Sequence, residues 1–225
     1  SEELTWAMNT YAPALVAERY PSARIVAFST GNVYSLTPVA LGGATEEGPL
    51  GPVGEYAQSC LGRERVLTYF SQRNATPMTL LRLNYAVELR YGILLDIAHK
   101  VAAGAPIDLT MGSVNVIWQG DANSAALRSL ALAASPPTVL NITGPETLSV
   151  RSAAVQLGEL LGVEPRFEGS EAPTALLNNA TRAHAALGYP SVPLATLLRW
   201  VAGWVRIGGP TLNKPTHYEQ RDGRF

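Results

Sequence analysis

The chain has 225 residues, 47% of them hydrophobic and 16% charged, which fits one sizeable globular domain or a domain with a small lobe. Its 17 basic and 18 acidic residues give a net charge of -1 with no long run of either sign, so nothing indicates binding to nucleic acid or to an anionic membrane. A single cysteine excludes an internal disulfide framework, and no apolar run approaches the ~20 residues of a membrane span. Without a signal-peptide pattern at its start, the chain is expected to be cytoplasmic.

Helices and short apolar strands alternate along the sequence. Apolar residues at helical spacing predict helices over 4–20, 56–71, 93–103, 149–162 and 194–206. Short apolar runs predict strands over 24–28, 78–83, 107–109, 114–118 and 139–143. The polar tail over 211–225 is expected to be an extension that packs late or loosely. This order predicts an α/β fold with a parallel sheet.

Two polar stretches stand where such a sheet binds ligands. Ser29 and Thr30 follow the strand over 24–28, at its carboxyl end, and Tyr56 opens the next helix. Cys60 and Arg63 come one and two turns after Tyr56 and share a helix face with it.

These residues resemble the short-chain dehydrogenase/reductase superfamily, specifically its extended branch of NAD-dependent epimerases and dehydratases. In that branch a Ser or Thr ends one strand, and a Tyr-x-x-x-Lys motif opens the next helix. The resemblance implies a doubly wound, Rossmann-like parallel sheet with a small carboxyl-terminal substrate lobe. Residues 1–145 would form the carboxyl-side part of the dinucleotide-binding domain, and residues 146–225 would form mainly the substrate lobe and the tail.

The resemblance also implies roles for individual residues. Tyr56 would be the catalytic proton shuttle and Thr30 would orient the substrate oxygen, with NAD or NADP as cofactor and no metal. The positions implied to contact the cofactor are Ser29, Thr30, Tyr56, Cys60, Asn9, Asn84 and Tyr85. Asn9 has an alternative place on a solvated helix face, and Asn84 stands one position earlier than the asparagine of the family's turn.

Cys60 stands where the family has its lysine. That lysine holds the nicotinamide ribose and lowers the pKa of the tyrosine, whereas an unperturbed tyrosine titrates near pH ~10 and gives little phenolate at neutral pH. One hypothesis is that Arg63 supplies the missing charge. The other is that Cys60 is a buried, inert thiol, as free cysteines usually are.

No Gly-x-x-Gly-x-x-Gly turn of the kind that binds a dinucleotide pyrophosphate precedes the strand over 24–28. Gly42-Gly43 is too isolated and follows the catalytic strand rather than preceding it. Either the chain is the carboxyl-terminal two-thirds of a longer protein, and roughly one hundred residues that precede it are missing here, or the cofactor site is lost. The start at Ser1, without Met, favours the first explanation.

Asp121 matches an acid of the family at the start of a helix, but we expect it to be an N-cap. The segments 112–115 and 169–172 lack the arginines that clamp a nucleotide diphosphate, so a smaller polar or carbonyl substrate is expected. Arg82, Arg90 and Arg166 are the other arginines considered for contact with it.

Two functions stay open: an NAD(P)-dependent epimerase, dehydratase or other oxidoreductase, or a non-catalytic dinucleotide- or metabolite-binding protein of the same fold. The resemblance also implies a homodimer built on the helices over 4–20 and 56–72.

Overall fold

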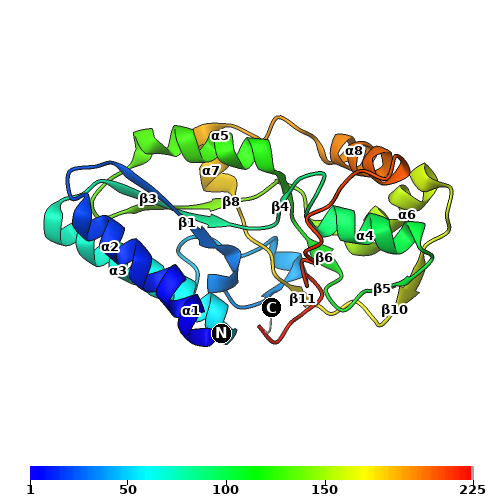
Figure 1. Cartoon of the computed structure of the whole chain (residues 1–225), viewed down its shortest axis with the longest axis horizontal. Coiled ribbons are helices and arrows are strands. Elements are labelled where there is room, and N and C mark those ends of the chain that lie inside the picture. Colours follow the sequence, from blue (N-terminus) through cyan, green and yellow to red (C-terminus); the bar gives the residue numbers. More distant parts are fainter. Residues whose placement is uncertain (224–225) are drawn as a thin grey trace.

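A parallel sheet lies at the centre of the computed structural model, which describes residues 1–223 (Figure 1). Strands β1 (Ile25–Thr30), β3 (Met78–Leu83) and β8 (Thr138–Ile142) pair in the order β1-β3-β8. The register places Thr30 opposite Leu83 and Leu83 opposite Ile142, so the three carboxyl ends meet at one edge. The strands predicted over 24–28, 78–83 and 139–143 are therefore confirmed, with small shifts at their ends.

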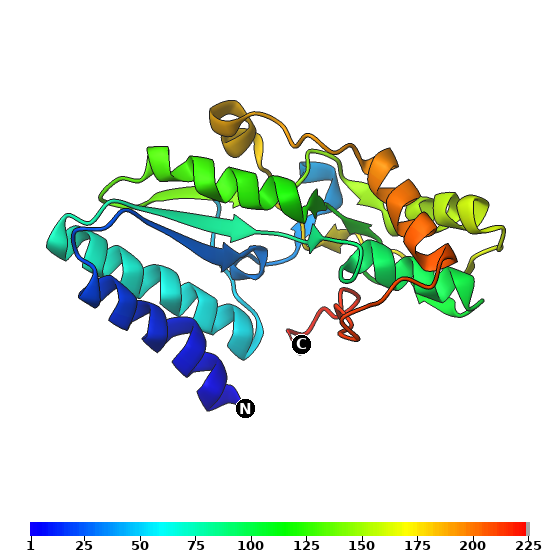
Figure 2. The ribbon, with the colours of Figure 1, turned by 45° about the horizontal axis from the view of Figure 1, so that its top comes forward.

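Helices cover both faces of this sheet (Figure 2). On one face, α1 (Glu2–Trp6), a π-helical turn (Ala7–Tyr11) and α2 (Ala12–Arg19) form one continuous rod beside α3 (Gly54–Asn74). On the other face lie α5 (Gln119–Ser129) and α7 (Thr181–Leu187). Side chains of β3 alternate between the two layers, because Leu80 packs with Ala17 and Leu67 whereas Leu81 packs with Ala122. This arrangement is the predicted α/β fold with a parallel sheet covered on both sides.

The largest hydrophobic core belongs to a helical lobe beside the sheet. It is built on α4 (Ile93–Ala102), α6 (Val150–Leu161) and α8 (Leu194–Arg206). Ser149 caps α6 by accepting a hydrogen bond from the backbone N–H of Ser152, and Gly162 ends it at φ 74°, as the sequence predicts. The helix over 194–206 is found with its predicted bounds, and its apolar stripe is buried.

Short elements connect the sheet to the lobe. The strands are β2 (Thr37–Pro38), β4 (Ala86–Val87), β5 (Pro106–Asp108), β6 (Ser113–Val114), β7 (Ile117–Trp118), β9 (Leu148–Ser149), β10 (Arg166–Glu168) and β11 (Thr174–Ala175). The 3-10 turns are Gly31–Val33, Val39–Leu41 and Leu130–Leu132. The strands pair as β5 with β10, β2 with β11, β4 with β7 and β6 with β9.

The single strand predicted over 114–118 was wrong, because the chain turns at Asn115 and forms β6 and β7 instead. The side chain of Asn115 accepts a hydrogen bond from Asn84 Nδ2 at 2.8 Å and donates one to the Asn178 carbonyl at 2.7 Å. These long-range hydrogen bonds stabilise the turn between the two strands, and no local sequence pattern predicts them.

The tail is also packed more firmly than predicted. Tyr218 is 1% exposed, and Thr216 donates from its backbone N–H and its hydroxyl to Asp96 Oδ2, at 2.9 and 2.6 Å. Arg221 donates to the Thr174 carbonyl at 2.8 Å. The prediction of a loose extension is therefore wrong for the part over 216–221, whereas most of 211–215 is exposed, and the last two positions of the tail lie outside the described residues. Within the part of the chain that the structure describes, no helix is both long and apolar enough to cross a membrane.

Candidate active site

A cleft of about 490 Å³ opens at the carboxyl ends of β1 and β3, between the sheet and the helical lobe. Five of the predicted site residues line it: Ser29, Thr30, Tyr56, Asn84 and Tyr85. The other walls come from the start of α4 and from the tail over 214–218. The tertiary structure therefore brings together residues that are far apart in the sequence, from the end of β1 to the tail.

Thr30 and Tyr56 meet inside this cleft. Thr30 is the last residue of β1, is 8% exposed, and its hydroxyl accepts a hydrogen bond from the backbone N–H of Asn32 at 3.2 Å. Tyr56 stands in the first turn of α3, and hydrogen bonds link its hydroxyl to the side chains of Thr30 and Cys60. A strand end and a helix start thus place two hydroxyls side by side where a substrate oxygen can reach both.

The Tyr56 hydroxyl is protonated at neutral pH. Burial of the hydroxyl raises its pKa to about 12, and the neighbouring Cys60 also acts to raise it. The hydrogen bond with Thr30 and the charge of Arg63 lower the pKa, but they do not offset burial. The residue as a whole remains 40% exposed. Tyr56 is therefore placed to donate a proton more readily than to accept one.

Cys60 is a buried thiol that does not line the cleft. It is 0% exposed, and burial raises its pKa, whereas the charge of Arg63 lowers it. Arg63 Nη2 lies 3.4 Å from the Cys60 sulfur. The same guanidinium donates to the Asn9 carbonyl at 2.8 Å and to the Phe28 carbonyl. These bonds fix a cation beside the position where the family has its lysine, one turn further along α3.

Asn9 lies in the π-helical turn and outside the lining of the cleft. Its amide nitrogen donates to Ser59 Oγ at 3.0 Å, and its amide oxygen accepts from Arg63 Nη2 at 2.8 Å. The side chain thus connects the first helix to α3 and is not solvated. Its contact with a cofactor stays a prediction.

Asn84 and Tyr85 form the turn after β3. Asn84 is 3% exposed, and its side-chain amide donates to Asn115 Oδ1 and to the Leu176 carbonyl. Its amide hydrogens therefore connect the turn to the segments at Asn115 and Leu176. Tyr85 has φ 40°, an uncommon left-handed conformation for a bulky residue, and burial raises its pKa. Strained backbone of this kind concentrates at functional sites.

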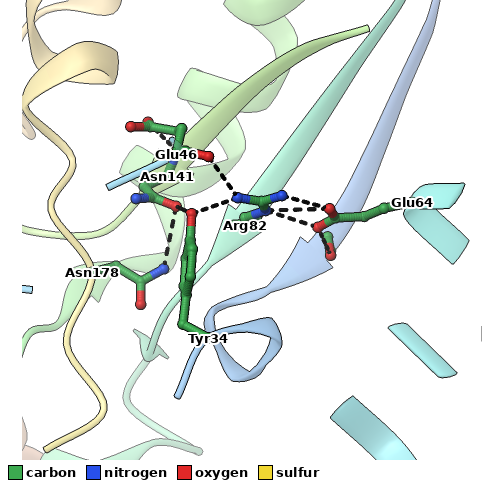
Figure 3. A network of polar contacts seen from close by, with 7 residues as sticks. Tyr34, Glu46, Glu64, Arg82, Asn141 and Asn178 are labelled. Carbon is green, nitrogen blue, oxygen red and sulfur yellow. Dashed lines mark hydrogen bonds and ion pairs between the residues drawn. The ribbon is translucent and has the colours of Figure 1, made fainter. Parts of the chain in front are cut away.

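A buried network of hydrogen bonds and an ion pair lies beside the cleft (Figure 3). The sequence analysis did not predict it. Glu64 of α3 and Arg82 of β3 form an ion pair of 2.8 Å, and each residue is 5% exposed. Ser29 Oγ donates to Glu64 Oε1 at 2.6 Å. On the other side Arg82 Nη1 donates to the Tyr34 hydroxyl at 2.6 Å, which donates to Asn141 Oδ1 at 2.9 Å. The network fixes the end of β1 against α3.

Arg82 is bound within this network and does not line the cleft, so it does not make the substrate contact that was considered for it. Its position gave a usable signal, since it is the one charged residue in the apolar run over 78–83, and a buried charge needs a partner. Arg90 and Arg166 also lie outside the lining of the cleft.

Asp121 does not cap α5, contrary to the expectation. The helix begins at Gln119 with Trp118 as its N-cap. Asp121 lies in the first turn and accepts hydrogen bonds from Ser191 Oγ at 2.7 Å and from the backbone N–H of Val192 at 3.1 Å. Its carboxylate therefore fastens the segment before α8.

The tail contributes cleft residues that sequence reasoning also missed: Lys214, Pro215, Thr216, His217 and Tyr218. Nothing in their composition signals this position. Across residues 1–223, the structure contains no group of three or more His, Cys, Asp or Glu side chains that could hold a metal ion.

No protein-family model matches the sequence, and no curated protein matches it significantly. Solved structures do match. One is the UDP-glucose 4-epimerase of Thermotoga maritima with UDP-glucose, with a TM-score of 0.76 and 17% identity over 92% of this chain and 72% of that chain. Another is the UDP-glucose 4-epimerase of Thermus thermophilus in complex with NAD, with a TM-score of 0.72 and 19% identity over 86% of this chain and 67% of that chain.

A third is the UDP-glucuronic acid 4-epimerase of Bacillus cereus in complex with NAD, with a TM-score of 0.75 and 17% identity over 88% of this chain and 67% of that chain. At such identities the likeness is one of fold. The chain therefore has the Rossmann-like α/β fold of these epimerases.

Proposed function

We propose that the protein is an NAD(P)-dependent oxidoreductase of the epimerase/dehydratase type, acting on a sugar-like or other small carbonyl or hydroxyl substrate. The observation that carries this proposal is the pairing of the Thr30 and Tyr56 hydroxyls in a cleft at the carboxyl end of β1. The fold neighbours that are complexed with NAD support the choice of cofactor.

The residues present fit the nicotinamide end of such a dinucleotide. The cleft offers hydroxyl and amide groups from Thr30, Asn32 and Tyr56, and no carboxylate lines it among residues 1–223. Tyr56 would hold the ribose side, and the turn at Tyr85 would face the ring. The bound dinucleotide would supply hydride transfer.

In this mechanism the chain's own side chains handle the substrate oxygen. Thr30 orients it through its hydroxyl, and Tyr56 exchanges a proton with it at the phenolic oxygen. The charge of Arg63 acts on Tyr56 in the same direction as the missing lysine would, because it lowers the pKa of the hydroxyl, but burial outweighs it. Arg63 does not take over ribose binding, since its guanidinium is held by the carbonyls of Asn9 and Phe28.

The second candidate is a binding protein of the same fold that turns nothing over. It is favoured by one observation, the high pKa of Tyr56 in a site where Cys60 replaces the lysine. A tyrosine that stays protonated cannot act as a base at neutral pH.

Replacing Tyr56 with Phe separates the two candidates. The parent and Tyr56→Phe are compared for NAD(H) and NADP(H) binding by calorimetry, and for turnover on a panel of sugars and small carbonyl compounds. We expect Tyr56→Phe to lower turnover by at least about 100-fold while dinucleotide binding persists, because the proton shuttle is lost. Tyr69→Phe, on the exposed side of the same helix, is the control and should behave as the parent.

Equal turnover in the parent and Tyr56→Phe would refute the enzymatic role. A parent that binds a dinucleotide but converts no member of the panel would establish the binding protein, and a gain of turnover in Cys60→Lys would then support it.

A homodimer through the first helical rod and α3 belongs to this proposal, as does the division into residues 1–145 and 146–225. The dimer is supported by large apolar side chains that the rod exposes, among them Leu4, Met8, Tyr11 and Leu15. Analytical ultracentrifugation of the parent and Met8→Asp tests it, and a parent that sediments as a monomer would rule it out.

A further inference from the structure

The tail over 211–223 runs from the helical lobe back to the sheet. Figures 1 and 2 show it in red, from the end of α8 to the neighbourhood of the start of α3. Its residues 214–218 line the cleft together with Thr30 and Tyr56. Its last described residues lie against Val53 and against the turn that follows β1, with a space of about 30 Å³ between them. The tail therefore lies beside the chain neighbours of both paired hydroxyl residues.

Two glycines join the tail to the start of α3. Gly54, the first residue of this helix, has φ 81°, and Gly223 has φ 75°. A Cβ on Gly54 would lie 2.9 Å from the carbonyl carbon of Gly223, and a Cβ on Gly223 would lie 2.6 Å from that of Val53. Side chains do not approach backbone atoms so closely, so the contact requires glycine on both sides. The tail thus docks two residues before Tyr56.

Other contacts hold the tail on the lobe side of the cleft. Thr216 donates from its backbone N–H and its hydroxyl to Asp96 of α4, at 2.9 and 2.6 Å. Arg221 donates to the Thr174 carbonyl of β11 at 2.8 Å, and Tyr218 buries its ring in the core of the lobe. The tail is therefore attached on both sides of the cleft, to the lobe over 216–221 and to the start of α3 at its end.

Docking leaves polar groups of the tail without partners. Among residues 1–223, four buried side-chain atoms have no hydrogen-bond partner, and two of them, the Tyr218 hydroxyl and Gln220 Oε1, belong to the tail. Buried polar atoms nearly always have a partner, so these two oppose docking. Asn213 and His217 have φ 49° and 52°, and this backbone strain opposes it as well. Release into water would relieve all four residues, and only burial of the Tyr218 ring and the polar contacts would be lost.

We propose that the tail over 211–223 is a strap that closes one side of the cleft and is released independently of the rest of the fold. In the docked state the contact between Gly54 and Gly223 ties the lobe to the start of α3, and the strap forms a wall beside Tyr56. In the released state the cleft lacks this wall and admits a ligand. The proposal rests on the proposed function in one respect, since the ligand is the dinucleotide or substrate assigned to this cleft.

Hydrogen–deuterium exchange followed by mass spectrometry tests the proposal on the full chain without a ligand. Strap peptides contain hydrogen-bonded amides, such as that of Thr216, whereas peptides from β3 and α4 report unfolding of the sheet and of the lobe. In the parent we expect the bonded amides of the strap to exchange at least about 100-fold faster than those of β3 and α4, because release exposes them without unfolding either unit.

Gly223→Ala should weaken docking, because its Cβ would overlap the Val53 carbonyl. We expect exchange in the strap to rise about tenfold or more while β3 and α4 keep the rates of the parent. Trypsin cleavage after Arg221 should rise in parallel. Gly208→Ala is the matched control, since Gly208 precedes the strap with φ 64°, and apart from its chain neighbours no described atom lies within 4 Å of its Cβ position. It introduces similar backbone strain but keeps the contact with α3, so its strap should exchange as in the parent.

The proposal is overturned if the strap of the parent exchanges as slowly as α4, if Gly223→Ala exchanges as the parent does, or if Gly208→Ala accelerates the strap as much as Gly223→Ala. NADH titrated into the parent tests closure of the cleft. Bound NADH should slow exchange of the strap about tenfold or more, because it would bind the docked state preferentially. NADH that binds without slowing the strap overturns the closure. Absence of NADH binding refutes only the proposed function, since release of the strap is measured without a ligand.

Discussion

Removing one partner of the buried pair Glu64–Arg82 should destabilise the protein strongly. Both residues are 5% exposed, so the partner left behind is a charge in a medium that solvates it poorly. Among residues 1–223, Arg82→Met leaves Glu64 with the Ser29 hydroxyl as its one hydrogen-bond partner and deprives the Tyr34 hydroxyl of its donor. Breaking such a pair costs about 3–5 kcal/mol. In a chain of this length, that lowers the melting temperature by about 6–20 °C.

The cost comes from the orphaned charge and not from the loss of the pair itself. Replacing both partners, as Glu64→Leu with Arg82→Met, should therefore recover most of the stability, to within about 2 kcal/mol of the parent. Glu64→Gln should cost less than Arg82→Met, because the amide can keep hydrogen bonds with Ser29 and Arg82.

Urea unfolding followed by circular dichroism of the parent, Glu64→Leu, Arg82→Met and the double variant measures these differences as a double-mutant cycle. Arg65→Met is the control, since Arg65 is exposed on the same helix and should change the free energy of unfolding by no more than about 0.5 kcal/mol. The reasoning fails if Arg82→Met is as stable as this control, or if the double variant is less stable than Arg82→Met alone.

Two glycine substitutions should act in opposite directions. A Cβ at Gly31 would lie 2.8 Å from Asn178 Oδ1 and 2.9 Å from Asn84 Oδ1, so Gly31→Ala should lower the free energy of unfolding by about 1–3 kcal/mol. Gly203 lies inside α8, and apart from its chain neighbours and the backbone of its own helix no described atom lies within 4 Å of the place a Cβ would take, so Gly203→Ala should raise the free energy of unfolding by about 0.5–1 kcal/mol. Chemical denaturation measures both, and a destabilised Gly203→Ala or a neutral Gly31→Ala would contradict the packing described.

Several elements could be predicted from the sequence because their causes are local. The apolar run of β3 and the helical stripe of α8 have the predicted bounds, and Ser149 caps α6 as its position before an apolar helix indicates. The pairing of Thr30 and Tyr56 was implied by the resemblance to a family, and the topology agrees with it. One ends a strand and the other begins the next helix, and both positions face the carboxyl edge of a parallel sheet.

Other features were decided by tertiary contacts between distant segments. The place of Asp121 near the start of a helix predicts an N-cap, but its carboxylate accepts hydrogen bonds from Ser191 and Val192, which lie 70 and 71 residues further along the chain. Asn115 interrupts a predicted strand because its amide is shared between Asn84 and the Asn178 carbonyl.

The sequence by itself determined the alternation of helices and strands, since periodicity and caps depend on neighbours within a few positions. Only the tertiary structure decided which polar groups would be paired inside the protein. Glu64 and Arg82 are ordinary surface residue types until a helix and a strand bury them against each other. The composition of the tail predicts a loose segment, but in the structure Asp96 and Arg90 bind it by hydrogen bonds and Tyr218 is buried beside the cleft. A buried polar group needs a hydrogen-bond partner, and the partner often comes from a distant part of the chain. The residues next to it in sequence therefore do not show which group that will be.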